Sequence, residues 1–211
     1  MTGLLYKDFY ILWHAYRKNL ALVAVLYGAM AVAMDMGFML FMLCWVMGFY
    51  VIGSISIDNA SKWDLYAACL PVSRGQVVGA KFLLTALALL AGCVYGGLIS
   101  GLLWLVNGTP LDESFVSIGV VAAICLAYFG VTLTLSYQFG VEKARTSMLL
   151  LVAGLGVLVI AGVKMGLLDD HALVQINADP LSWGLGLGAV CAAVYLICWA
   201  VSAAIYRKKE L

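Results

Sequence analysis

The sequence carries very little charge. Only 11% of its 211 residues are Asp, Glu, Lys or Arg, against about 25% in a typical soluble domain. Hydrophobic residues make up 65%, and the mean hydropathy is +1.05. So few charged side chains cannot cover the surface of a water-soluble fold of this size. Proline is also scarce, at 3 residues, and the 22 glycines follow no repeat, which argues against a fibrous or disordered chain.

Patterns that carry catalysis or bind metals are missing as well. The two histidines, His14 and His171, are predicted at opposite surfaces, so neither can act as the base of a membrane serine nucleophile. The six cysteines have no Cys-x-x-Cys spacing and no neighbouring histidine, which supports neither disulfides nor a metal site. The sequence also lacks a GxxxxGK[ST] phosphate loop. We therefore expect no enzymatic activity and no cofactor on this chain.

Long uncharged runs are what the sequence has instead. Six stretches of 16 to 30 residues contain no Asp, Glu, Lys or Arg. A membrane-spanning helix needs about 20 mostly apolar residues. The pattern predicts an all-α membrane protein, one domain over residues 1–211, with six transmembrane helices at residues 18–34, 36–57, 78–106, 112–139, 147–168 and 180–206.

Lysine and arginine are divided unevenly between the two ends of these spans. If both termini lie on one side, eleven of the twelve basic residues fall on that side, and only Lys164 falls on the other. Basic residues are enriched in cytoplasmic loops, so both termini are predicted to be cytoplasmic. The net charge of +1 gives no sign of a nucleic-acid partner, and none is expected.

Residues 4–18 have an amphipathic pattern ahead of the first predicted span. Apolar residues recur at i, i+4, i+7 and i+11 from Leu5, and Lys7, His14 and Lys18 lie on the opposite face. The pattern predicts a helix lying along the surface of the lipid bilayer. The alternative is that these residues simply extend the first span.

The segment over residues 58–72, between the second and third predicted spans, is the most informative part of the chain. Asp58 can cap a short helix that starts there, Pro71 ends it, and Ser73 with Gln76 forms a capping box for the next helix. An aromatic face at spacing i, i+3, i+7 and two charges belong to this short helix: Trp63, Tyr66 and Leu70, with Lys62 and Asp64. Such a face either docks a cytoplasmic protein, since Trp and Tyr are enriched at binding hot spots, or rests on lipid.

Polar residues alternate near the inner end of the fourth predicted span, at Thr132, Thr134, Ser136 and Gln138. They either form hydrogen bonds between helices or line a substrate pathway. The membrane core has almost no ionisable side chain besides Lys164, which argues against an ion-coupled carrier.

The stretch SKWDLYAACLPVSR at residues 61–74, followed by Ala80-Lys81-Phe82, resembles small permeases of the ABC-2 type. It is most similar to the bacterial branch that includes the phenol-soluble-modulin exporter permeases. The start LYKD at residues 5–8 and the end YRKKEL at residues 206–211 resemble that branch too. Cys69 stands where Ser is expected and Phe82 where Tyr is common, which are mild departures.

The resemblance implies a function. The chain would be the permease subunit of an ATP-driven exporter, in which two permeases pair and two separate ATPase chains, which bind ATP and Mg, dock beneath them. The amphipathic segment 4–18 would be the elbow helix, and residues 59–68 the coupling helix. The ATPase-coupling residues would be Asp58, Lys62, Trp63, Asp64, Tyr66, Leu70 and Arg74.

The lack of fixed charge along the predicted pathway suits amphipathic or apolar cargo. The resemblance to peptide exporters implies that this cargo is an amphipathic or hydrophobic peptide, moved for export or for self-protection. The competing hypothesis is a membrane scaffold or assembly factor that does not transport and docks a cytoplasmic partner through residues 58–72.

Overall fold

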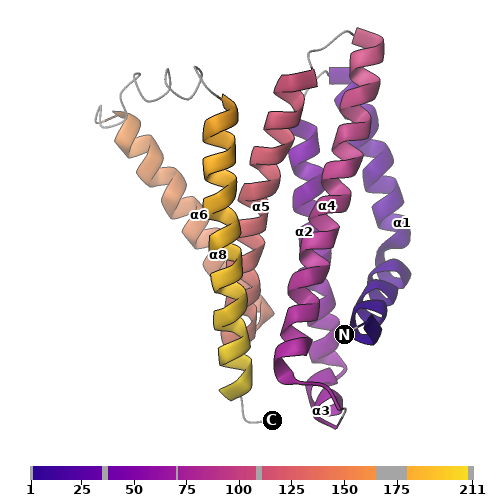
Figure 1. Cartoon of the computed structure of the whole chain (residues 1–211), viewed down its shortest axis with the longest axis vertical. Helices are drawn as coiled ribbons and strands as arrows, with labels where there is room; N and C mark the ends of the chain where they lie inside the picture. Colours follow the sequence, from indigo (N-terminus) through magenta and orange to yellow (C-terminus); the bar gives the residue numbers. More distant parts are fainter. Residues whose placement is uncertain (1, 35–37, 70, 108–110, 165–179, 209–211) are drawn as a thin grey trace.

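The computed structural model describes residues 2–34, 38–69, 71–107, 111–164 and 180–208, and this part of the chain is all helical, without strands (Figure 1). The predicted all-α class is confirmed. The helices are α1 (Thr2–Met34), α2 (Phe38–Ala60), α3 (Trp63–Ala68), α4 (Arg74–Asn107), α5 (Leu111–Phe139), α6 (Val141–Lys164) and α8 (Pro180–Lys208).

Four stretches within the described residues are long and apolar enough to cross a membrane. They correspond to the second, third, fourth and sixth predicted spans, and they are Met42–Ala60, Arg74–Leu105, Ile118–Phe139 and Gly184–Lys208. Helices α1 and α6 have 33 and 24 residues but are not among these stretches. The molecule is therefore a multi-pass membrane protein, and the full count of six spans stays a prediction.

The long helices pack side by side. Helix α5 lies between α8 and α4, α2 packs against α1, α4 and α5, and α6 packs mainly against α5. In Figure 1 both chain ends lie towards the lower part of the molecule, where α3 also lies, and α6 leans away from α8 at the opposite end. The helix ends near α3 are therefore the place where the N-terminal segment, α3 and the last turn of α8 gather.

Aromatic side chains fill the contact between α2 and α5. The fully buried Phe129 ring on α5 meets Trp45 and Phe49 of α2, with ring centroids 5.7 Å away in both cases. Gly48 of α2 faces the same ring, and a Cβ at this position would overlap it. The absence of a side chain at Gly48 is what lets α2 and α5 approach closely here.

Helix α1 is continuous through the boundary predicted between a surface helix and the first span. Its first part lies at an angle to the remainder in Figure 1. In this part Leu4 and Asp8 are buried against the protein, whereas Phe9 and Trp13 are exposed. The predicted apolar stripe is therefore divided: Phe9 faces away from the protein, whereas Leu5 packs against the hydrophobic core and the Tyr16 ring lies 4.5 Å from that of Tyr50 on α2.

The boundary between α2 and α3 differs from the prediction. Helix α2 continues past Asp58 to Ala60, and α3 starts only at Trp63, with Lys62 at its N-cap in a left-handed conformation (φ 54°). The predicted cap at Asp58 is wrong, because the Asp58 carboxylate pairs with two lysines from other helices. The predicted capping box is confirmed: the backbone N–H of Gln76 donates to Ser73 Oγ at 3.3 Å, and the backbone N–H of Ser73 donates to Gln76 Oε1 at 3.1 Å.

The close approach at Gly48 generates a prediction. Gly48→Ala should lower the midpoint of thermal unfolding in detergent, because overpacking against Phe129 costs about 1–3 kcal/mol, more than the roughly 1 kcal/mol that Ala gains over Gly in a helix. Gly101→Ala on α4 is the matched control, since a Cβ there meets nothing within 4 Å. Equal midpoints for the two variants would contradict the packing described for Gly48.

Candidate functional site

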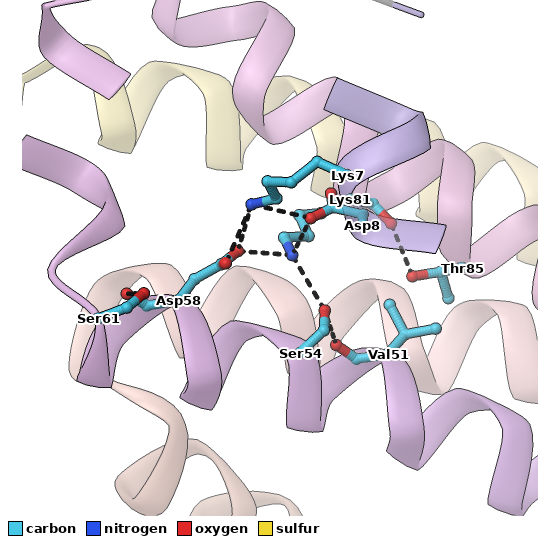
Figure 2. Close-up of polar contacts among 8 residues, drawn as sticks. All are labelled: Lys7, Asp8, Val51, Ser54, Asp58, Ser61, Lys81 and Thr85. Carbon is cyan, nitrogen blue, oxygen red and sulfur yellow. Dashed lines mark hydrogen bonds and ion pairs between the residues drawn. The ribbon is translucent and has the colours of Figure 1, made fainter. Parts of the chain in front are cut away.

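Four charged side chains from three helices meet near the end of the molecule that holds α3 (Figure 2). Lys7 and Asp8 come from α1, Asp58 from α2 and Lys81 from α4, and we call these four residues the ion cluster. Lys81 Nζ lies 2.8 Å from Asp8 Oδ1 and 2.7 Å from Asp58 Oδ2. Lys7 Nζ lies 3.0 Å from Asp8 Oδ1 and 3.0 Å from Asp58 Oδ1. Each lysine therefore bridges both carboxylates.

The ion cluster is largely removed from water. The exposed fraction of the side chain is 3% for Asp8, 8% for Asp58 and 5% for Lys81, against 22% for Lys7. Two positive and two negative charges cancel, which is the condition under which buried charges are tolerated. Loss of any one member would leave an uncompensated charge among apolar helices.

Polar neighbours complete the hydrogen bonding of Lys81. Besides the two carboxylates, its ammonium group donates to Ser54 Oγ at 3.0 Å, so all three of its N–H groups have acceptors. Ser54 Oγ in turn donates to the Val51 carbonyl at 2.8 Å, and Thr85 Oγ1 donates to the Lys81 carbonyl at 2.9 Å. Ser54 precedes Asp58 by four residues, so helical spacing places both on the face of α2 that Lys81 meets.

The ion cluster also reaches α3. Lys7 Nζ lies 3.9 Å from the centroid of the Trp63 ring, in the geometry of a cation–π contact. Trp63 is partly buried against the hydrophobic core, and its ring lies 5.3 Å from that of Tyr66. Tyr66 itself is 60% exposed. The aromatic face predicted for this segment therefore divides into an inward Trp63 and an outward Tyr66.

The remaining residues predicted for coupling are spread around α3. Lys62 is exposed at the start of α3, and Asp64 lies on α3. Arg74, at the start of α4, donates through Nη1 to the Arg207 carbonyl of α8 at 2.9 Å. Leu70 lies outside the described residues. Asp58 is the member of the predicted set that the structure places in the ion cluster.

The four polar residues near the end of α5 lie in different surroundings. Thr132 Oγ1 donates to the Tyr128 carbonyl of its own helix at 2.8 Å. Thr134 Oγ1 lies 3.2 Å from the Cys198 carbonyl of α8 and accepts a hydrogen bond from Ser202 Oγ at 2.9 Å. Thr134 thus joins two helices, and neither threonine lines the cavity described next.

A cavity of about 210 Å³ lies between the ends of α2, α4 and α5, and Ser136 and Gln138 line it. Asp58 and Lys81 of the ion cluster lie on its opposite wall. Gly140, at the junction of α5 and α6, closes one side with φ +88°, a conformation that favours glycine. The cavity therefore brings two of the predicted pathway residues near two members of the ion cluster.

Sequence reasoning missed the ion cluster. It took Lys7 for the polar face of a surface helix, Lys81 for part of the family motif, and Asp58 for a helix cap and an ATPase-coupling residue, and it paired none of them. The available signal was that opposite charges lie on the predicted cytoplasmic side of three spans: residues 7–8 in the segment before the first, residue 58 just after the second and residue 81 at the start of the third. Among the described residues no group of three or more His, Cys, Asp or Glu could hold a metal ion. The charged groups of the ion cluster are paired with one another, so the cluster connects three helix ends.

The chain is similar to a family of membrane transport proteins. The family model described as "ABC-2 family transporter protein" matches residues 3–207, which include the ion cluster and α3. No curated protein and no solved structure matches the chain.

The burial of the ion cluster generates a second prediction. Lys81→Met should lower stability by about 3–5 kcal/mol, because two buried carboxylates then share one lysine. Adding Asp8→Asn to the Lys81→Met variant makes the ion cluster neutral again and should recover part of the lost stability. Lys143→Met, at an exposed position of α6, is the control for loss of a lysine. The thermal unfolding midpoint in detergent measures all three variants, and a Lys81→Met midpoint equal to that of Lys143→Met would show that the ion cluster is dispensable.

Proposed function

Since this chain belongs to the ABC-2 family of transporter proteins, we propose that it is the permease subunit of an ATP-driven exporter in a bacterial cell membrane. In this proposal it crosses the bilayer six times with both termini in the cytoplasm. It pairs with a second permease chain, and separate ATPase chains bind ATP and Mg and supply the energy.

The lengths of α1 and α6 support the count of six. Residues 19–34 of α1 and residues 146–163 of α6 are free of Asp, Glu, Lys and Arg. Runs of 16 and 18 residues are close to the roughly 20 needed to cross a bilayer, and Arg17 and Lys18 can extend their charged ends to the interface. Because eleven of the twelve basic residues fall on the side of the termini, the end of the molecule that holds α3 is assigned to the cytoplasm.

The observation that best supports coupling to an ATPase is the position of α3. This six-residue helix lies outside the four apolar stretches, exposes Tyr66 and Lys62, and contacts the ion cluster through Trp63. A partner bound to its outer side would therefore act directly on the ends of α1, α2 and α4. We assign α3 as the coupling helix, with Tyr66 as the central contact and with Lys62, Asp64, Leu70 and Arg74 around it.

The proposed pairing of two permeases is supported by apolar surface that a single chain leaves uncovered. Leu149 and Leu150 of α6 are 67% and 69% exposed, and Leu185 of α8 is 68% exposed. Lipid covers part of such a surface, and a second copy can cover the rest.

The proposed cargo is an amphipathic or hydrophobic peptide. The ion cluster is internally neutral and lies at one end of the helices, so it offers no net charge for binding an ion or a highly charged solute. An open apolar groove of about 270 Å³ between α4 and α8, lined by Phe82, Tyr195 and Trp199 among others, is likewise suited to apolar groups. The cavity beside Ser136 and Gln138 could receive polar backbone groups of such a peptide.

Docking through α3 generates a third prediction. Tyr66→Ala should reduce the amount of ABC ATPase that co-purifies with the tagged chain by about tenfold or more, as expected for loss of an aromatic hot spot. Trp104→Ala, which removes an exposed aromatic side chain further along α4, is the control and should leave the amount of co-purified ATPase unchanged. Quantitative mass spectrometry of the purified complexes measures the ratio. Equal recovery from Tyr66→Ala would refute docking at Tyr66, and absence of any ABC ATPase with the unaltered chain would favour the scaffold hypothesis.

The cargo generates a fourth prediction. In inverted vesicles that contain the permease and its ATPase, a labelled amphipathic helical peptide should accumulate inside when ATP is added. A peptide of the same length composed of hydrophilic residues should not accumulate, because the apolar groove between α4 and α8 offers its polar side chains no hydrogen-bond partners and burying them there is costly. ATP-driven accumulation of both peptides, or of neither, would contradict the proposed cargo class.

A further inference from the structure

We infer that Lys7 is a positioning residue for α3: its ammonium group, held by Asp58 and Asp8, fixes the Trp63 ring and with it the helix that presents Tyr66. The functional consequence of this inference rests on the proposed function, in which α3 is the segment that docks the ATPase. The contact between Lys7 and Trp63 lies within this chain and can be tested without a partner.

The contacts of Lys7 differ from those of Lys81 in one respect. Lys81 bridges both carboxylates and Ser54, and its side chain is 5% exposed. Lys7 bridges the same carboxylates, is 22% exposed, and adds the contact with Trp63 at 3.9 Å. Since Lys81 alone already joins α1, α2 and α4, the contribution specific to Lys7 is the connection to α3.

Helix α3 depends on such external contacts. It has six residues, and no side chain caps its N-terminus. A helix of one or two turns is unstable by itself, because nucleating a helix costs free energy and so short a helix forms few hydrogen bonds to offset that cost. What holds α3 in place is therefore the packing of its inward side chains, the buried Ala67 and the partly buried Trp63. A cation placed over the Trp63 ring stabilises one of these two contacts directly.

The segment that carries Lys7 has its own attachment on the other side. Tyr6, Phe9, Tyr10 and Trp13 are 72%, 58%, 56% and 56% exposed. Aromatic residues of this kind are enriched at the boundary between lipid and water. Through Lys7, α3 is thus connected to a segment fixed at the membrane interface. A displacement of α3 by a bound partner is expected to move the start of α1 as well as the end of α2.

Hydrogen–deuterium exchange of the purified chain in detergent tests the inference without any ATPase. Lys7→Met should accelerate exchange of the amides at residues 63–69 by about three- to tenfold, the size expected for loss of one cation–π contact. Trp63→Leu should have a similar effect, and the two substitutions together should not add, because they remove the same contact. Lys7→Arg keeps a cation over the ring and should restore slow exchange, and Lys18→Met, at an exposed site of the same helix, should have no effect.

Two controls separate positioning from loss of charge balance and from general destabilisation. The double variant Lys7→Met with Asp8→Asn leaves a neutral pair, Lys81 with Asp58, but no cation over Trp63. Fast exchange in this variant supports the inference, and recovery of slow exchange would overturn it. Equal acceleration at residues 125–136 of α5, in the core, would also overturn it, since the effect would then be global. Because no ATPase is present, failure here is distinguishable from failure of docking at Tyr66, which the co-purification measures.

Discussion

Two lysines and two aspartates lie largely buried where α1, α2 and α4 meet. Burial of each charge is tolerated because the opposite charges lie within hydrogen-bonding distance of it. Moving one of these helices away would expose an unpaired charge to apolar surroundings. The ion cluster therefore sets the relative position of three helix ends. Helix α8 is joined to the rest by neutral hydrogen bonds instead, such as the one that Ser202 Oγ donates to Thr134 Oγ1 of α5.

The position of α3 follows from this constraint. Lys7 extends the ion cluster to Trp63, so a helix too short to be stable alone is attached to three long ones. The Tyr66 ring lies 5.3 Å from that of Trp63 but is exposed. One aromatic residue thus anchors α3 to its own chain, and its neighbour is the exposed residue proposed as the docking contact. For a permease component of an ABC transporter, this is an economical way to join a docking surface to the membrane helices.

The polar residues at the same end of the molecule have separate roles. Thr134 joins α5 to α8, whereas Ser136 and Gln138 face a cavity whose other wall includes Asp58 and Lys81. A shift of α2 or α4 would change the shape of this cavity together with the ion cluster. The ion cluster and the cavity between the helices are therefore physically connected through Asp58, which belongs to both.

The all-α class, four of the membrane stretches, the capping box at Ser73 and Gln76, and the resemblance to the ABC-2 family could all be predicted from the amino-acid order, because hydropathy, capping and short motifs are local properties. The pairing of Lys7 and Asp8 with Asp58 and Lys81 could not. Residues 7, 58 and 81 belong to three different helices, and pairing across them depends on how the helices pack. The same packing turned Asp58 from a predicted cap into a buried ion-pair partner and divided the aromatic face of α3 into an inward Trp63 and an outward Tyr66.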